Sequence, residues 1–488
     1  MKNGKIDGVV EQESRNHWTQ IPPKKTCFAI SLAYTLVYTA FEAIQNLQSS
    51  INSGGNLGVT SLAISYGVVL ISAPLSPYLI RVFGIKNYLL AAWVAVALYC
   101  SCNFYPALAT FIPASILMGV AMGALGMIIG LYLSAAGKSY VLLNNLRSDR
   151  LHSVLSLFNG IFFMSFKSTQ ITGNLISSVV LSSSPYNRST SENNVCGAVV
   201  CSATWDNSTV EIELPEKDVL YILVSVFLAC IAAGFVVTLL LLPKLDVYAD
   251  EPEEWAALND GSETKDRRVA KKSVQRKHAL ENAKSCIGLL RSSYVLLVPL
   301  FMAQGMSVVV LFTGYTQGFV SCSAGIRWVG YTMIAYGASS SLVALSLNYL
   351  VRYLNRSILF VAFIGTDIGL AVAMLVWRPD SGTHFGMFFI IPALAGLTEG
   401  ISQPQFNALI STVFKKNEPQ AFACFHLSKC MAFALSLALS GVACLYHRLY
   451  LTLALYILGF AGYVVFEVRE RRKKQSVGEN ETGSLRKP

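Results

Sequence analysis

The chain has 488 residues, of which 53% are hydrophobic and only 14% are charged, and its mean hydropathy is +0.50. This composition excludes an ordinary soluble domain and indicates a polytopic membrane protein. The formal net charge of +10 raises the question of a nucleic-acid partner. We expect none, because the basic residues lie in loops and tails between apolar segments.

Twelve apolar runs of at least 18 residues predict twelve transmembrane helices. The runs are too long and too uniformly apolar for the strands of a membrane barrel. We therefore expect an all-α multi-pass membrane protein with two six-helix halves. The predicted spans cover residues 27–47, 57–80, 88–105, 108–136, 154–181 and 219–242 in the first half, and 294–315, 328–350, 358–377, 386–414, 421–445 and 449–468 in the second.

The distribution of Lys and Arg predicts the orientation of these spans. With both termini in the cytoplasm, 31 of the 38 basic residues fall on that side and five on the other. Residues 1–26 are polar and contain no cleavable signal peptide, so we expect the first helix to act as its own insertion signal. The expected layout is a cytoplasmic tail at 1–26, a six-helix half at 27–242, a basic cytoplasmic linker at 243–293, a second half at 294–468, and a basic cytoplasmic tail at 469–488.

The longest outer loop, residues 182–218, holds two cysteines and two glycosylation sequons, which are features of the non-cytoplasmic side. Cys196 and Cys201 lie in this loop, and Cys322 follows the seventh span on the same side. An oxidising compartment allows one disulfide among these three cysteines. Pairing of the two loop neighbours is favoured, although Cys322 can replace either of them. Seven further cysteines, Cys444 among them, fall in predicted spans, where a small buried apolar role is expected.

Charged residues inside spans are the first candidates for a functional site, because charge within the hydrocarbon region is costly. Glu42 and Lys167 lie at similar depth in their spans, so a salt bridge within the first half is expected. Glu399 and Lys429 differ in depth and call for water or another partner. The full set of intramembrane candidates is Glu42, Lys167, Asp367, Glu399 and Lys429, with His426 three residues before Lys429 on the same helical face.

Polar residues extend this set along two spans. Lys167, Gln170 and Asn174 recur at intervals of three and four and form one stripe, which must face the bundle interior. Gln403 lies beside Pro404, where a kink frees backbone carbonyl groups. Two interpretations remain open: a hydrated cavity with a ligand, ion or switching role, and a static lock between helices.

Two six-span halves, each with a short basic turn after its second span, resemble the major facilitator superfamily. The superfamily's turn normally carries an Asp before its basic residues, and neither turn here has an acid at that place, which argues against ordinary transport. Several further stretches resemble the uncoordinated-93-like family, a divergent branch of that superfamily. They are QNLQSS at 45–50, NGIFF at 159–163, GNLISS at 173–178, CGAVVC at 196–201, WRP at 377–379 and QPQFNAL at 403–409.

The resemblance implies a major facilitator fold and an accessory rather than catalytic role. Family members regulate two-pore-domain potassium channels or escort Toll-like receptors from the endoplasmic reticulum. We expect a regulatory subunit of a potassium channel, with a proton- or ion-coupled transporter and a trafficking escort as alternatives. No nucleotide-binding loop, metalloprotease motif or C-x-x-C pair occurs, so we expect no enzyme activity, cofactor or metal. No endocytic signal is evident, which favours the plasma membrane over endosomes or the endoplasmic reticulum.

The predicted orientation makes a glycosylation test possible. Asn187 and Asn207 lie in sequons of the outer loop, whereas the sequon at Asn355 falls on the cytoplasmic side. We expect the first two to carry glycans and the third to stay bare. Glycosidase mapping of single Asn→Gln variants measures this, and a glycan on Asn355 would overturn the orientation.

Overall fold

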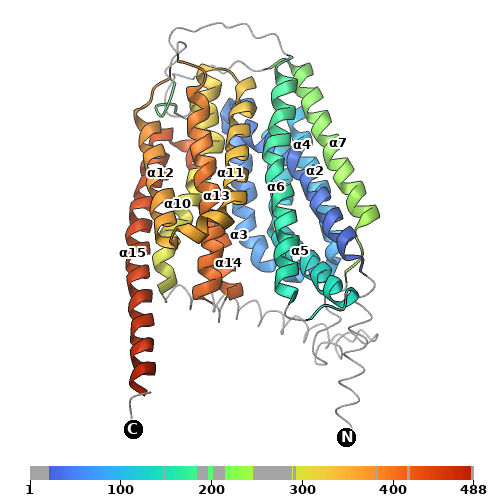
Figure 1. Cartoon of the computed structure of the whole chain (residues 1–488). Coiled ribbons are helices and arrows are strands. Elements are labelled where there is room, and N and C mark those ends of the chain that lie inside the picture. The colour runs from blue at the N-terminus through green and yellow to red at the C-terminus, as the bar shows by residue number, and fades with distance from the viewer. Residues whose placement is uncertain are drawn as a thin grey trace, which may run out of the picture.

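The computed structural model describes residues 21–147, 150–183, 196–201, 215–245, 288, 293–379, 383–414 and 418–484. Within these residues, long helices run side by side and form one bundle (Figure 1). The first half contains α2 (Pro23–Ile51), α3 (Leu57–Phe83), α4 (Ile85–Ser101), α5 (Leu108–Leu143), α6 (Leu151–Leu181) and α7 (Lys217–Leu241), with short turns η1 (Gly54–Asn56) and η2 (Cys102–Phe104).

The second half follows the same plan. Its first span is a stack of η5 (Ser293–Leu297), α10 (Val298–Val309) and η6 (Val310–Ser321), of which η6 is wound as a π-helix. The remaining spans are α11 (Arg327–Tyr353), α12 (Arg356–Val376), α13 (Met387–Val413), α14 (Glu418–Val442) and α15 (Leu445–Ser484). The prediction of an all-α bundle with two six-helix halves is confirmed.

Nine helices of the described chain are long and apolar enough to cross a membrane by length and composition. The long helices outside that set are α6, α11 and α13, which carry more polar side chains. These three contact one another, α6 with α11 and α11 with α13. Since α6 belongs to one half and the other two to the second half, the most polar helices meet at the boundary between the halves (Figure 1).

Equivalent helix pairs pack in both halves. Contacts of α3 with α5, α2 with α6, and α4 with α7 in the first half correspond to those of α11 with α13, α10 with α14, and α12 with α15 in the second. The basic turns are anchored in equivalent ways. Lys86 Nζ donates to the carbonyl oxygens of Leu239 (2.8 Å) and Leu242 (2.7 Å) at the end of α7. Arg356 Nη2 binds Glu467 Oε2 on α15 at 2.8 Å. Each turn is thus tied to the last helix of its own half.

Each half also has its own aromatic core. In the first, the buried Tyr34 ring lies edge-on to Trp93 at 4.9 Å between ring centroids. In the second, the buried Phe301 ring lies edge-on to Phe406 (5.0 Å) and Phe425 (4.9 Å). Aromatic pairs of this geometry stabilise beyond the area they bury. Each half thus has its own aromatic cluster and its own anchored turn, while the buried apolar core continues from the first half into η6 and α11 of the second.

The bundle has two distinct ends. At the terminal end, α2 begins and α15 runs out of the bundle (Figure 1). At the opposite loop end, residues 196–201 form a short segment, here called the strap, that comes from the first half and packs on the second. Gly197 N donates to Gly318 O (2.8 Å), and Leu445 N and Tyr446 N donate to Val200 O (3.1 Å) and Ala198 O (3.0 Å).

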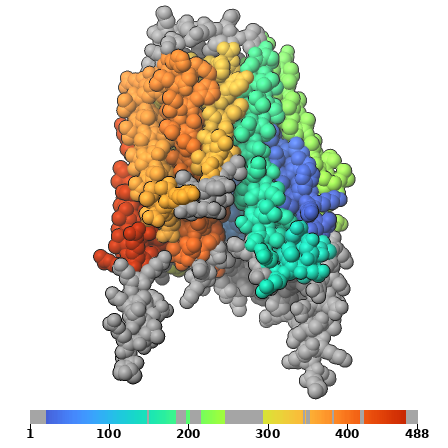
Figure 2. Space-filling model, viewed as in Figure 1, coloured from blue at the N-terminus to red at the C-terminus, as the bar shows by residue number. Residues whose placement is uncertain are grey.

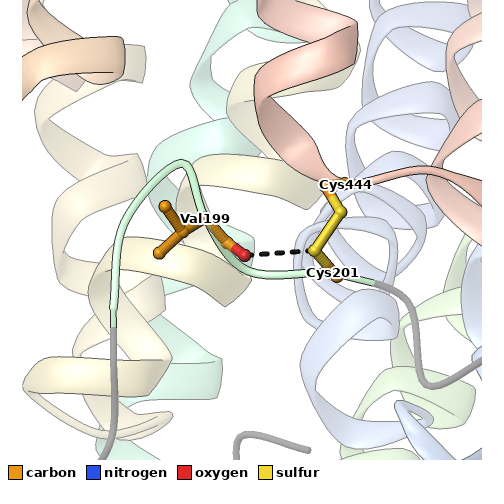
Figure 3. The surroundings of a disulfide bond; sticks show 3 residues. All are labelled: Val199, Cys201 and Cys444. Carbon is orange, nitrogen blue, oxygen red and sulfur yellow. Dashed lines mark hydrogen bonds between the residues drawn. A yellow bond between two sulfur atoms is a disulfide. The ribbon is translucent and has the colours of Figure 1, made fainter. Parts of the chain in front are cut away.

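Two disulfides fix the strap to the second half. Cys196 pairs with Cys322 after η6, and Cys201 pairs with Cys444 at the start of α15 (Figure 3). Gly197 adopts φ +108°, and a Cβ there would lie 3.1 Å from the carbonyl oxygen of Trp377. A glycine is therefore required where the strap approaches the backbone beneath it.

The favoured pairing of Cys196 with Cys201 is wrong, and the alternative in which Cys322 takes one of them is what the structure has. Cys444 is not a buried apolar residue of a span. It lies in the turn between α14 and α15, because α14 ends at Val442 and α15 begins at Leu445. The sequons at Asn187 and Asn207 lie outside the described residues.

The strap yields a covalent test. Peptide mapping of the unreduced protein should recover one peptide pair containing Cys196 with Cys322 and another containing Cys201 with Cys444. A Cys444→Ser variant should lose only the second pair and should lower the melting temperature, since removal of a native disulfide typically costs about 2–5 kcal/mol. Recovery of a peptide in which Cys196 is joined to Cys201 would contradict this connectivity.

Candidate functional site

An ion pair between the two halves lies at the centre of the polar interior. Lys167 Nζ of α6 lies 3.1 Å from Glu399 Oε1 of α13. The side chains are only 28% and 11% exposed. Tyr336 of α11 donates its hydroxyl hydrogen to the other carboxylate oxygen, Oε2. Side chains of both halves therefore bind Glu399: Lys167 of the first half and Tyr336 of the second.

Glu42 lies beside this pair but does not bond Lys167 directly. Its Oε2 accepts a hydrogen bond of 2.5 Å from Thr169 Oγ1, and it interacts electrostatically with Lys167 and with Glu399. The expected salt bridge between Glu42 and Lys167 does not form. Lys167 pairs with Glu399 instead, and Glu42 accepts its hydrogen bond from Thr169. Thr169 faces α2 and satisfies the glutamate, whereas Lys167, two residues earlier on α6, points across to α13.

Lys429 adds a second cation to the group. Its Nζ donates to Gln403 Oε1 at 2.8 Å, and it interacts electrostatically with Glu399. Gln403 is one turn along α13 from Glu399, so it bridges the depth difference that the sequence left unexplained. His426 is exposed, and its ring lies beside Phe425 at 5.2 Å between centroids.

Asp367 forms a neighbouring site within the second half. Its carboxylate is 4% exposed and accepts hydrogen bonds from Thr398 Oγ1 (2.7 Å) and Tyr456 OH (2.8 Å). Thr398 immediately precedes Glu399, so the two acids share a stretch of α13. The cavity bordered by Gln304, Tyr336 and both acids has a volume of about 10 Å³, room for about one water molecule.

Gln170 and Asn174 form an amide cluster with a residue that the sequence did not single out as their partner. Asn46 Nδ2 of α2 donates to Gln170 Oε1 (3.2 Å) and to Asn174 Oδ1 (3.0 Å). The predicted stripe on α6 therefore divides. The side-chain amides of Gln170 and Asn174 bond to α2 within the first half, whereas the side chain of Lys167 forms an ion pair with the second half.

The backbones of α6 and α11 approach closely beside this amide cluster. A Cβ on Gly330 of α11 would lie 2.4 Å from the carbonyl oxygen of Asn174. Small residues allow helix backbones to approach in this way in membranes. Nearby, at the loop end, Ser50 and Ser321 hydroxyls are 2.8 Å apart across the halves. The polar site is thus closed on the side of the loop end.

Arg448 is a buried cation, and it is one of the five basic residues that the charge count assigned to the non-cytoplasmic side, between the last two predicted spans. It is 3% exposed, and its Nη2 donates to Thr313 Oγ1 (2.8 Å) and Ser436 Oγ (3.2 Å). The difference arises because α15 begins at Leu445 and carries Arg448 inward on its first turn. The signal was the very short gap between the last two predicted spans, since a loop of that length leaves little room outside the helices.

In chemical terms, the central site is a group of two cations and two carboxylates, and in the described part of the chain the ion pair that joins the halves here is that of Lys167 with Glu399. The sequence profile described as "Ion channel regulatory protein UNC-93" matches residues 50–466. This chain belongs to the UNC-93 family. Its members are not known as enzymes, and this member is a multi-pass membrane protein.

Relatives of known name match about nine tenths of the chain. Protein unc-93 homolog A of Bos taurus is 32% identical, over 92% of this chain and 94% of that protein. The human protein of the same name is 29% identical, over 92% and 94%. The Putative potassium channel regulatory protein unc-93 of Caenorhabditis elegans is 26% identical, over 90% of this chain and 60% of that protein.

Solved structures with the same fold are major facilitator transporters. A peptide transporter POT in complex with sulfate superposes with a TM-score of 0.60 at 12% identity, covering 92% of this chain and 94% of that chain. The nucleoside transporter NupG superposes with a TM-score of 0.57 at 12% identity, covering 90% and 99%. The fold is that of the major facilitator superfamily, and identity this low extends the likeness no further than the fold.

A double-mutant cycle tests the central ion pair. Lys167→Gln and Glu399→Gln should each lower the melting temperature in mild detergent, because each leaves a partly buried charge without its partner. The double variant should recover part of that loss, with an interaction free energy of about 1–3 kcal/mol. Lys25→Gln, at an exposed position on α2, is the matched control for loss of one positive charge. Strictly additive effects would show that the two side chains do not interact in the folded protein.

Proposed function

We propose that this protein is a regulatory subunit of a potassium channel at the plasma membrane. The observation that carries the proposal is the paired state of the central site. Its charges bind one another, and the cavity beside Glu399 and Asp367 holds about one water. Sites for small molecules usually have volumes of about 300–1,000 Å³. Among the described residues, the space beside Glu399 and Asp367 is filled by side chains and is too small for a solute.

A paired centre suits a protein that responds to a partner. The bond between Lys167 and Glu399 exists only while α6 and α13 face each other, so its energy favours one relative arrangement of the halves. A partner that binds one arrangement better than another shifts the equilibrium between them. The channel then senses the arrangement through its contacts with the outer helices, and no substrate has to cross.

Family membership supports the choice of partner. The matching profile is named for ion channel regulation, and the Caenorhabditis elegans relative carries the name of a putative potassium channel regulator. We take the partner to be a two-pore-domain potassium channel. On the charge distribution, we place the terminal end in the cytoplasm and the loop end outside.

A second candidate is a proton- or ion-coupled transporter. It is favoured by one observation, namely that a carboxylate, a lysine and a phenol meet across the halves of a transporter fold. A protonatable group at such a position can couple ion movement to a change of arrangement. This alternative differs from the first in requiring a saturable solute flux.

Co-expression in oocytes distinguishes the two. Alone, the protein should give no saturable uptake and no proton-linked current. With a two-pore-domain potassium channel, it should change the channel's open probability at unchanged surface abundance. Glu399→Gln and Lys167→Gln should each change that effect severalfold, because each alters the balance between the arrangements of the halves.

Lys25→Gln should leave the channel effect as it is in the wild type and serves as the control. Saturable uptake that Glu399→Gln abolishes, without any channel effect, would establish the transporter. An increase in channel surface abundance with unchanged open probability would indicate a trafficking escort, and would reject the regulatory proposal.

A further inference from the structure

A groove on the surface of the first half lies apart from the central site. It runs between the beginning of α2 and the middle of α6, and its volume is about 370 Å³. Apolar side chains form most of its walls, and short hydroxyl side chains keep it open. The lining residues are Lys24, Cys27, Phe28, Ser31, Leu32 and Thr35 of α2, with Phe158, Ile161, Ser165 and Ser168 of α6.

The groove faces outward from the bundle. Phe28 is 60% exposed and Ile161 is 44% exposed. The opposite side of α2 faces the core, where Tyr34 OH donates to the carbonyl oxygen of Leu125 on α5. Figure 2 shows the surface of α2, in blue, between α6 in teal and α7 in green. In a membrane, lipid chains therefore reach this part of α2 directly.

The hydroxyl groups of the groove do not call for a polar ligand. Ser31 Oγ donates to Cys27 O (2.8 Å), Thr35 Oγ1 donates to Ser31 O (2.8 Å), and Ser168 Oγ donates to Ser165 O (2.7 Å). Each is satisfied by its own helix. What these residues contribute is shape, because a short side chain leaves room that a leucine would fill.

The length of the groove matches one leaflet of a bilayer. From Lys24 to Thr35 the helix rises about 16 Å, at about 1.5 Å per residue. The hydrocarbon core of a bilayer is about 30 Å thick, so one leaflet contributes about half of it. The groove starts at the terminal end of α2 and stops near the middle of the bundle. A transmembrane helix of a partner would need a seat along the full thickness.

A single cation marks the interfacial end of the groove. Lys24 lies in the first turn of α2, where the helix enters the bundle, and its side chain is exposed. Its ammonium group is placed at the depth of the phosphate groups, above apolar walls at the depth of the acyl chains. Basic residues at this depth attract anionic lipids by about 1 kcal/mol each.

We propose that this groove is a binding site for one anionic glycerophospholipid of the leaflet at the terminal end. One acyl chain lies between Phe28 of α2 and Ile161 of α6, and the phosphate group contacts Lys24. The bound lipid fills the space between α2 and α6 and so joins the two helices at the end opposite to the strap. This site is independent of the proposed channel partner, and its existence does not rest on that function.

Native mass spectrometry of the purified full-length chain tests the proposal. The protein is delipidated in detergent and then incubated with palmitoyl-oleoyl phosphatidylserine or with the corresponding phosphatidylcholine. The wild type should retain one phosphatidylserine in preference to phosphatidylcholine. Lys24→Gln should reduce that preference about fivefold. Lys25→Gln removes the adjacent charge outside the groove lining and should leave the preference unchanged.

Ser165→Trp should abolish retention of both lipids, because the indole occupies the space of the acyl chain. Leu175→Trp is its control, since Leu175 is 46% exposed on α6 beyond the groove. If Ser165→Trp does not elute as a monodisperse species, Ile161→Trp replaces it. Equal retention of the two lipids by the wild type would overturn the proposal, as would equal effects of Lys24→Gln and Lys25→Gln. Undiminished lipid retention by the Trp variant would leave the groove to a protein partner and would likewise reject it.

Discussion

The ion pair between Lys167 and Glu399 is the interaction on which the arrangement of the two halves depends. Charges inside a bilayer are costly, and each must find a partner within the protein. Here the partners lie in different halves, so neither half satisfies its own charges completely when it is separated from the other. Tyr336 and the neighbouring lysine of α14 then complete the hydrogen bonding and charge around the glutamate.

The same constraint explains why α6, α11 and α13 differ from the other helices. A lipid-facing helix cannot carry a lysine or a glutamate at mid-depth, whereas a helix at the boundary between the halves can. These three helices lie outside the set that qualifies as spans by composition, and they are the ones that provide Lys167, Tyr336 and Glu399. In this chain, the lower hydropathy of α6, α11 and α13 reflects their place at the boundary between the halves, and all three helices still run through the bundle.

Sequence patterns predicted the helices well and their partners poorly. The length of the apolar runs predicted the twelve helices, and the spacing of polar residues predicted the inward stripe on α6. Both signals are local in the sequence. The partner of Lys167 depends on how two halves far apart in sequence meet, and no local pattern contains that. Similar depth led to Glu42 as the expected partner of Lys167, but in the fold Thr169 binds Glu42 and Lys167 points to Glu399 of the other half.

Cysteine pairing failed for the same reason. Cys196 and Cys201 are neighbours in sequence, but the strap lies flat on the second half and directs its two sulfur atoms to different elements there. Cys444 was hidden by an apolar turn, which resembles the interior of a span. A turn of two residues between α14 and α15 is too short to show the polar composition that usually marks a loop.

The strap also changes where the boundary between the halves lies. By sequence, residues 196–201 belong to the first half, yet both of their disulfides, and the backbone hydrogen bonds that they form with described helices, are with the second half. The strap is therefore fixed to the second half at both of its ends, by the disulfide of Cys196 with Cys322 and by that of Cys201 with Cys444. The central linker joins the two halves, and in the described part of the chain the two disulfides of the strap join them again, so cleavage of the linker alone would leave one disulfide-linked molecule in an oxidising environment.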